Sequence, residues 1–567
     1  MTRAEERRWP QLELLSDASV AFWRRAMAPL RISWRRSWLY RRSLKGKMSD
    51  RIVFHPADPM PRRLEGAELL LRGRFRFAGA TVDVDDGSVF DASPPSTDWA
   101  CAMHAFEWLP PLAAAGGEAA KTLATNLMTQ WMRRNARYGE PAWSADVMGY
   151  RLVNIFAHGR FVLANSDVLW RSKLFVSLRE QARVMSRSVD EATDGLPRLA
   201  AAVAQVLCGT CLSENAGRLN ASVAQLEGVI GNQILADGGH ITRSPEALLE
   251  AYRLLEMAMD ALAAADAAIP STLRNAHDRM APMLRFFRHS DGALALFNGG
   301  AEGEPRMVEA LLARDEVRGQ PFTWAPHSAF QRLAAGRSIV VMDCGTVPSG
   351  AMSTHAHAGC LAFEFSAGSQ RLVVNCGPEI AGLDWNGVSR STAAHSTITL
   401  ADTSMAHVLA PGMMRDLVGA RMTAGPSRVE TSRLDSAESV RVDAVHDGYV
   451  PRFGVSHERT LSLTPRGNAL AGVDRLLRVE RRASPGALAF AARFHIHPDV
   501  RLSPSQGGDF LLKLPNGDGW RFRSSADCRI EESVYLGAGK FRRGEQVVIG
   551  GGIKDAPVEL TWSFEQL

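Results

Sequence analysis

The sequence predicts a helical N-terminal half followed by an antiparallel β-sandwich, and three observations support this fold class. From about residue 99 to residue 287, apolar side chains recur with the 3.6-residue period of amphipathic helices, without intervening strand-like runs. Around residues 320–337 the period changes to two. From there to the C-terminus, short alternating runs are separated by Gly and Asp turns, a pattern typical of antiparallel sheets packed as a sandwich.

The helical half is expected to start after a short lead-in. Alternation between Ala67 and Val84 predicts a hairpin or a single strand. Consecutive helices with short breaks rich in Gly, Asp, Pro and Asn then predict an incomplete (α/α) toroid or a solenoid-like bundle. The predicted helices are Ala119–Tyr138, Trp143–Leu163, Ser177–Ser188, Leu196–Cys208, Arg218–Leu235, Pro245–Ala267 and Ser271–Phe287.

The β half is expected to begin near residue 325. The predicted domains are therefore a basic N-terminal arm (1–64), a helical toroid domain (65–325) and an antiparallel β-sandwich domain (326–567). The predicted strands are Ser338–Asp343, Leu361–Phe365, Leu372–Val374, Ser396–Leu400, Ser439–Asp443, His457–Leu463, Leu488–His497 and Val558–Trp562.

Charge is concentrated at the N-terminus. The chain of 567 residues has a net charge of +5, yet Met1 to Lys47 alone holds twelve Arg/Lys against four Asp/Glu. The remaining 520 residues therefore sum to about −3, which argues against a nucleic-acid partner for the body of the protein. The arm mixes Trp and Arg, so it could lie on an anionic membrane surface or pack against the body.

No apolar export segment follows the early arginines, and no run of about 18 apolar residues predicts a transmembrane helix. On this evidence alone the protein would be cytoplasmic.

Histidines cluster in the predicted β half. His355 and His357 form an H-x-H pair that we expect to feed a strand, Asn375 follows another strand, and His395 opens a third. Alternation along the strand would place His355 and His357 on one face, with His355 directed at the pocket and His357 back toward Asn375 and His395. Neighbouring strands with this spacing can direct imidazoles into one pocket. A second H-x-H pair, His495 and His497, is expected to have a structural role.

Several sequence motifs, in the order in which they occur, resemble those of the heparinase II/III-like family of polysaccharide lyases. The resemblance extends from about Arg72 to His497. The motifs are Phe106-Glu-Trp108-Leu109, Trp143-Ser-Ala-Asp-Val-Met-Gly-Tyr-Arg151-Leu-Val-Asn154, Gln233-Ile-Leu-Ala-Asp237-Gly-Gly-His240-Ile-Thr-Arg243-Ser-Pro245, the first H-x-H stretch and His446-Asp-Gly-Tyr449.

The resemblance implies β-elimination of an acidic, uronate-containing glycan in a cleft between the two domains, often with a structural zinc in the sandwich. It also makes a periplasmic location an alternative to the cytoplasm. Elimination requires a group that neutralises the carboxylate, a base for the adjacent proton, and an acid for the leaving oxygen. Arg or Asn suits the first task, and His or Tyr suits the others.

Residue by residue, His355 matches the family position that reaches the cleft, as a base or a carboxylate-neutralising group. We expect His240 and Arg243 to bind an anion at a helix N-terminus. Because the family's Tyr is absent from the helix entry after Asp237-Gly-Gly-His240, Tyr449 is the best remaining hydroxyl for the acid.

Residues of two further motifs are expected to contact the substrate. Arg151 and Asn154 share a helix face that could grip a uronate, unless Arg151 merely pairs with Asp146. His446 is also expected to contact the substrate.

His357 and His395 match two zinc-ligating positions of the family, but the third ligand, an Asp in the family, is Asn375 here. A neutral amide is a poor zinc ligand. The alternatives are therefore a structural zinc or a metal-free His–Asn–His hydrogen-bonded cluster, and no cofactor is required for the predicted reaction.

Three functions follow from these residues. The first is a polysaccharide lyase. The second, which the two departures from the family favour, is a non-catalytic glycan-binding or envelope-polysaccharide assembly protein. The third is a hydrolase, which would need paired carboxylates, and Asp237 and Glu246 are the obvious acids near the predicted cleft.

Overall fold

The computed structural model forms two compact units, which are described separately. The helical unit comprises Leu15–Ile234 and Glu250–Asp278, and the β unit comprises Leu235–Leu249 and Arg279–Leu567 together with residues 9–14. The structure describes residues 9–46, 49–60, 64–84, 87–212, 216–315, 319–380, 387–479, 487–505, 507–554 and 556–567.

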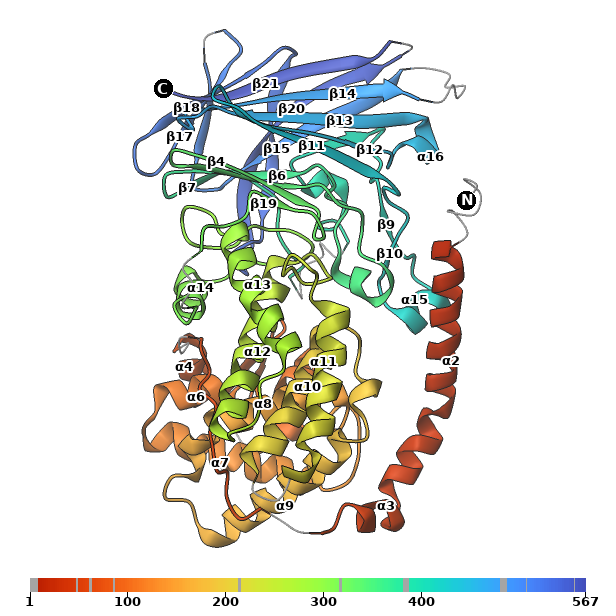
Figure 1. Ribbon diagram of the computed structural model, residues 1–567, viewed down its shortest axis with the longest axis vertical. Coiled ribbons are helices and arrows are strands. Elements are labelled where there is room, and N and C mark those ends of the chain that lie inside the picture. The colour runs from red at the N-terminus through yellow and green to blue at the C-terminus, as the bar shows by residue number, and fades with distance from the viewer. Residues whose placement is uncertain are drawn as a thin grey trace. The chain divides into compact units, whose positions relative to one another are not determined.

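The helical unit has the consecutive helices that the 3.6-residue period predicts (Figure 1). A hairpin of β1 (Arg74–Phe77) and β2 (Ala80–Asp83) precedes the helices from residue 97 onward, as expected, but Leu69–Leu71 belongs to a helix. The helices are α2 (Trp9–Arg36), α3 (Trp38–Ser43), α4 (Glu65–Leu71), α5 (Thr97–His104), α6 (Leu109–Ala115), α7 (Gly117–Arg134), α8 (Ala145–Leu163), α9 (Val168–Met185), α10 (Leu196–Cys211), α11 (Leu219–Gln233), α12 (Pro245–Ala264) and α13 (Ser271–Phe287).

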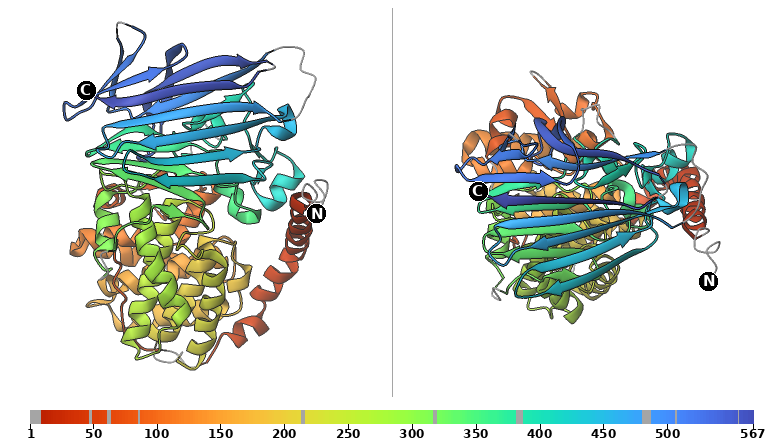
Figure 2. Two further views of the ribbon diagram at one scale, coloured as in Figure 1. Left: turned by 45° about the horizontal axis from the view of Figure 1, so that its top comes forward. Right: turned by 90° about the horizontal axis from the view of Figure 1, so that it is seen from above.

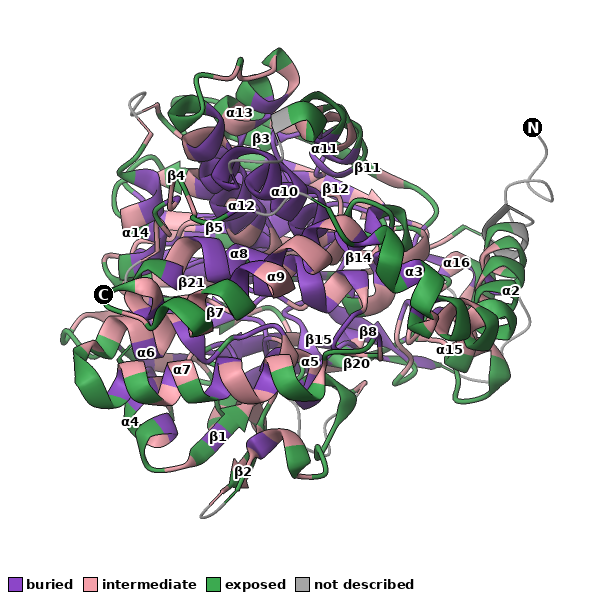
Figure 3. Ribbon diagram, turned by 90° about the horizontal axis from the view of Figure 1, so that it is seen from below, coloured by how far each residue is buried: buried purple, intermediate pink, exposed green. Residues whose placement is uncertain are grey.

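The centre of the helical unit is the packing of α8 against α10, both of which are largely buried (Figure 3). Small residues let the two backbones approach closely. A Cβ atom at Gly149 of α8 would lie only 2.8 Å from the backbone nitrogen of Ala201 in α10. The Ala-rich sequence of α10 therefore serves close helix packing.

In the β unit, every described strand pairing is antiparallel, and two large sheets form the sandwich (Figure 2). One sheet has the order β11-β12-β13-β14-β21-β18-β17-β16, and the other has the order β19-β20-β15-β7-β6-β5-β4-β3, with β8 also paired to β15. The strands of the first are β11 (Val429–Asp435), β12 (Val440–His446), β13 (Val455–Leu463), β14 (Ala469–Arg478), β21 (Val558–Gln566), β18 (Gly519–Ser524), β17 (Phe510–Lys513) and β16 (Arg501–Pro504). Those of the second are β19 (Cys528–Tyr535), β20 (Arg542–Ile553), β15 (Leu488–Ile496), β7 (Gln370–Val374), β6 (Phe363–Ala367), β5 (Ser338–Asp343), β4 (Phe330–Ala335), β3 (Trp324–Ala325) and β8 (Ile398–Leu400).

The sandwich core is aromatic. Phe363 of β6 stacks on Trp562 of β21, with ring centroids 5.4 Å apart, and Phe494 of β15 packs edge-on against Trp562 at 4.8 Å. These contacts join the inner faces of the two sheets. Burial of such large side chains is the main stabilising contribution to a sandwich.

The remaining elements of the β unit are short. They are α14 (Pro305–Leu312), α15 (Met413–Val418), α16 (Val450–Phe453) and the paired strands β9 (His407–Val408) and β10 (Met422–Thr423). The predicted fold class, helices followed by antiparallel sheets, is confirmed. Within the described ranges, we find no helix with the length and apolarity needed to cross a bilayer.

Candidate functional site

The loop that carries the first H-x-H pair is a turn of 3-10 helix, Gly350–His355, and not the strand that the sequence predicts. His355 is exposed at its end, whereas His357, two residues later, is buried. The expectation that strand alternation places both side chains on one face is therefore wrong. The two imidazoles nevertheless separate as expected, because only His355 reaches the surface.

Arg390 fixes the shape of this loop. Its buried guanidinium donates from Nε to the carbonyl of Ala356 (2.9 Å), from Nη2 to Ser353 (2.9 Å) and from Nη1 to Ala420 (2.8 Å). The backbone of Ala358 donates to the carbonyl of Arg390 in return. Arg390, which lies five residues before His395, thus holds the His355 turn in place.

His357 and His395 form a direct hydrogen bond, with Nδ1 of His357 3.1 Å from Nε2 of His395. Nδ1 of His395 lies 2.7 Å from the carbonyl of Ser391, which can only accept, so His395 carries its proton on Nδ1. Its Nε2 then accepts from His357. Burial holds the pKa of His395 at about 4 and that of His357 well below its usual value, so both rings are neutral at pH 7.

Asn375 does not join this pair. Its Nδ2 donates to the carbonyl of Leu296 (3.1 Å) and its Oδ1 accepts from the backbone of Ser396 (3.1 Å). The predicted His–Asn–His cluster is therefore a His–His pair, with Asn375 fixing the backbone next to His395.

The three residues do not suit a zinc ion in this arrangement. The lone pair of His395 Nε2 is occupied by the proton of His357, and the amide oxygen of Asn375 is occupied by a backbone N–H. Among the residues that the structure describes, no three His, Cys, Asp or Glu side chains converge as metal ligands would.

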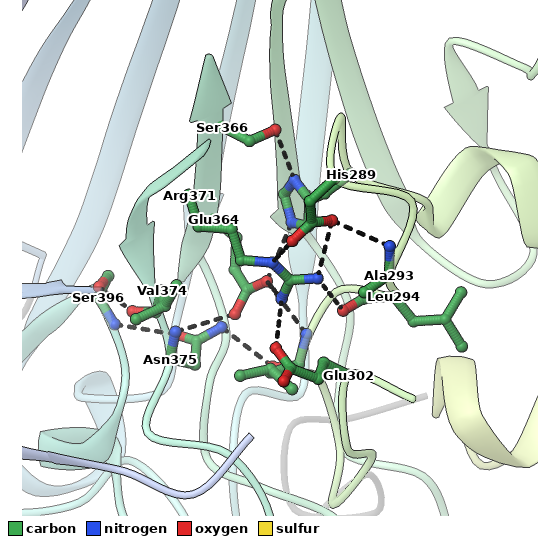
Figure 4. Close-up of polar contacts among 12 residues, drawn as sticks. His289, Ala293, Leu294, Glu302, Glu364, Ser366, Arg371, Val374, Asn375 and Ser396 are labelled. Atoms are coloured by element: carbon green, nitrogen blue, oxygen red, sulfur yellow. Dashed lines mark hydrogen bonds and ion pairs between the residues drawn. The ribbon is translucent and has the colours of Figure 1, made fainter. Parts of the chain in front are cut away.

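A buried charge network lies behind Asn375, and the sequence reasoning missed it (Figure 4). Glu364 of β6 accepts from the backbone of Asn375 (2.9 Å), from the backbone of Leu296 (3.1 Å) and from Nε2 of His289 (3.0 Å). Burial alone would raise the pKa of Glu364, but the hydrogen bond from His289 and the charge of Arg371 hold it below its ordinary value. Glu364 is therefore a buried carboxylate anion that anchors this end of the sheet.

Arg371 supplies the compensating charge. Its Nε donates to Asp291 (2.7 Å), its Nη2 donates to the carbonyl of Leu294 (3.0 Å), and its Nη1 lies 3.9 Å from Glu364. The sequence signal for this network was a glutamate between two phenylalanines in a buried strand, which requires a partner that the sequence does not identify.

The side chains of His240 and Arg243 form hydrogen bonds and an ion pair within the protein. His240 is buried, its Nδ1 accepts from the hydroxyl of Thr242 (2.7 Å), and burial lowers its pKa to about 4, so it carries no positive charge for an anion. Arg243 forms an ion pair with Asp343 and donates to the carbonyls of Ser328 (2.8 Å) and Thr346 (2.9 Å). This geometry favours a structural role for both residues over the predicted anion binding.

The acids considered for hydrolysis are engaged in the same way. Asp237 accepts from the backbones of His327 (2.9 Å) and Ser328 (2.6 Å), and Glu246 accepts from the backbone of Ala301 (2.9 Å). Asn298, which the sequence reasoning did not select, donates to the carbonyl of Arg243 and accepts from the backbone of His357. Asn298 thus connects the segment Asp237–Arg243 to the loop that carries His355 and His357.

Tyr449 lies in the sandwich core, where its hydroxyl donates to the carbonyl of Ile398 at 2.8 Å. Burial raises its pKa. His446 is buried as well, and Nε2 of His446 faces Nδ1 of His457 (3.3 Å), whose Nε2 donates to Asp474 (2.8 Å). A side chain enclosed in this way is poorly placed to touch a polymer.

Arg151 and Asn154 belong to α8 of the helical unit and share a face, as predicted. Arg151 is fully buried and donates to the carbonyls of His104 (2.8 Å) and Ala142 (2.7 Å) and to Gln181 (2.8 Å). Burial lowers its pKa to about 9. Asp146, the alternative partner, instead accepts from Thr193.

The comparisons define the class of protein: the chain belongs to the family of a curated relative and carries a heparinase II/III-like C-terminal domain. Residues 317–563 match the family described as heparinase II/III-like, C-terminal. A curated relative, FtsZ-localized protein C of Caulobacter vibrioides, is 32% identical over 522 residues, which cover 90% of this chain and 89% of that protein.

Solved structures share the fold at low sequence identity. A heparinase III structure superposes with a TM-score of 0.67 at 15% identity and covers 86% of this chain and 80% of its own. Heparan sulfate lyase HepC from Pedobacter heparinus gives a TM-score of 0.57 at 14% identity, with 93% and 87% covered. These similarities establish the scaffold.

Proposed function

We propose that the protein is a non-catalytic, glycan-binding member of the heparinase II/III-like family. The observation that carries this proposal is the burial of Tyr449, whose hydroxyl donates to Ile398 inside the core. The best remaining candidate for the acid is thus removed from solvent. Arg243, the predicted anion-binding residue, is paired with Asp343.

Glycan binding is supported by the His355 turn. Among the residues predicted for lyase catalysis, substrate binding or metal ligation, His355 is the exposed one. Arg390 holds the turn rigidly, and Gly419 at the end of α15 lies beside Thr354 of the same turn. Arg415, Asp416 and Arg421 belong to α15 or follow it closely, so two of these three charged residues are basic, which suits an acidic glycan.

The test combines binding and turnover on the full-length chain. Purified protein is titrated with a panel of uronate-containing glycans while the absorbance of an unsaturated product is followed. We expect saturable binding without product, and weaker binding by His355→Ala. The matched control is His407→Ala, which removes another exposed histidine of the β unit. Absence of binding across the panel would contradict the proposal.

The second candidate is the lyase itself, and the exposure of His355 is the observation that favours it. Formation of unsaturated product that disappears in His355→Ala would establish the lyase and refute the non-catalytic proposal. The acid would then have to be a group other than Tyr449.

We also propose that the N-terminal helix attaches the protein to an anionic membrane surface. Trp23, Met27, Leu30 and Trp34 of α2 are exposed and recur at positions i, i+4, i+7 and i+11, so they share one face. Exposed arginines on the rest of α2 complement acidic lipid headgroups. By its name the Caulobacter relative localises with FtsZ, which supports a role of this chain in a similar assembly.

A further inference from the structure

The β unit contains a cavity that none of the predicted site residues lines. Its volume is about 510 Å³, within the range of small-ligand pockets. Its walls come from Cys376 beyond the end of β7, residues 388–394, His495 of β15, and the adjoining parts of β19 and β20. All of these segments belong to one compact unit.

One wall presents a preorganised pair of side chains. Nε2 of His495 lies 3.0 Å from the carbonyl of Ala393, so it carries the ring proton. Nδ1 of His495 therefore accepts from the hydroxyl of Ser533 at 2.7 Å. Because burial lowers the pKa of His495 to about 3, the ring is neutral. The Ser533 oxygen, which also lies 3.9 Å from the thiol of Cys376, can accept from a ligand hydroxyl.

A second wall presents a hydroxyl without a protein partner. Ser389 is only 3% exposed, and its Oγ makes no hydrogen bond with the described part of the chain. A buried hydroxyl in that state is unfavourable unless something else pairs with it. Since Ser389 lines the cavity, a ligand inside it can provide that partner.

The rim indicates the chemistry of the ligand. Phe541 is 42% exposed and Val388 is 48% exposed, and together they offer apolar surface beside the cavity. The charged residues that line it, Glu532, Glu545 and Arg543, carry both signs and sum to −1, which disfavours an anionic ligand. An apolar rim with several hydroxyl partners suits a neutral ring that has C–H faces and hydroxyl edges.

We propose that this cavity binds a neutral sugar of one or two rings, with hydroxyls paired to Ser389 and Ser533 and one ring face on Phe541. No residue of the His355 turn (Gly350–His355) lines the cavity, so the protein would have one surface for an acidic glycan and one pocket for a neutral sugar. The proposal does not depend on whether the His355 turn binds a polymer.

The test is titration calorimetry of the full-length protein with methyl β-glucoside, N-acetylglucosamine, cellobiose and glucuronate. We expect saturable binding of at least one neutral sugar. Ser389→Ala and Phe541→Ala should each weaken it by roughly tenfold. Ser389→Ala should keep the melting temperature of the wild type, because the hydroxyl it removes has no hydrogen-bond partner among the described residues.

His355→Ala is the matched control and should bind the neutral sugar as the wild type does, whatever happens to polymer binding. The proposal is overturned if no neutral sugar binds saturably up to about 50 mM. It is also overturned if both cavity variants bind like the wild type, or if glucuronate binds more tightly than every neutral sugar.

Discussion

Nδ1 of His357 lies 3.1 Å from Nε2 of His395, and this hydrogen bond joins the two histidines that were considered as zinc ligands. The proton order along the pair is fixed by Ser391, whose carbonyl accepts from Nδ1 of His395. Asn375, with its amide bonded to Leu296 and Ser396, stabilises the backbone next to the pair. The two histidines and Asn375 thus form a set of hydrogen bonds between neutral groups.

We expect metal removal to have no effect on stability. Purified protein should contain far less than one zinc per chain, and EDTA should leave its melting temperature unchanged, because Nε2 of His395 and Oδ1 of Asn375 already have hydrogen-bond partners. Elemental analysis measures the zinc content, and thermal melts with and without chelator measure the melting temperature. About one zinc per chain, with a lower melting temperature after chelation, would show that the histidines rearrange around a metal.

Acid should destabilise the protein through His395. Its pKa is about 4 in the folded state, against about 6.5 in an unfolded chain. Below pH 6.5 the unfolded state therefore binds the extra proton, and the free energy of unfolding falls until about pH 4. The loss from this residue is up to roughly 3 kcal/mol.

Denaturant titrations between pH 4 and pH 7.5 measure that slope, which His395→Gln should make shallower. Should the variant not fold, calorimetry of the wild type provides a second test, since unfolding at pH 5 should take up protons. A free energy of unfolding that is constant from pH 7 to pH 4.5 would contradict the assignment of buried neutral histidines.

Neutralising Glu364 should be costly. Glu364→Gln keeps the shape but removes the charge that Arg371 faces and one acceptor for the backbones of Asn375 and Leu296. Breaking a buried charge pair costs about 3–5 kcal/mol, measured as the change in the free energy of unfolding in urea. Glu438→Gln, at an exposed position, is the control and should change it by less than about 0.5 kcal/mol. Equal stability of the two variants would show that the network does not anchor the sheet.

The sequence predicted what depends on local periodicity. Helix Ser271–Phe287 and strand Ser338–Asp343 have the predicted bounds. The helix has an amphipathic period, and the strand is a short apolar run that is buried on both faces. Leu69–Leu71 was expected to be extended but is helical, since three leucines fit either period. The H-x-H turn was expected to be a strand because alternation was assumed from the two histidines alone.

The side-chain contacts could not be predicted because they join residues far apart in the sequence. Glu364 meets His289, 75 residues earlier, and Arg243 meets Asp343, 100 residues later. Sequence spacing identifies residues that can do chemistry, and only the fold shows which of them already have partners. For Arg243 and Tyr449 the partner proved to be the protein itself.

The exposed face of α2 gives the most direct test of membrane contact. Trp23 is 62% exposed and Trp34 is 55% exposed, so replacing either one with glutamate should not disturb the packing of the chain. Full-length protein should co-sediment with vesicles that contain anionic phosphatidylserine, less with neutral vesicles, and less again as salt screens the arginines. Trp23→Glu combined with Trp34→Glu should abolish the binding. Leu434→Glu, at a 60% exposed leucine of β11, is the matched control and should bind as the wild type does. Equal sedimentation of all three proteins would show that α2 does not hold the membrane.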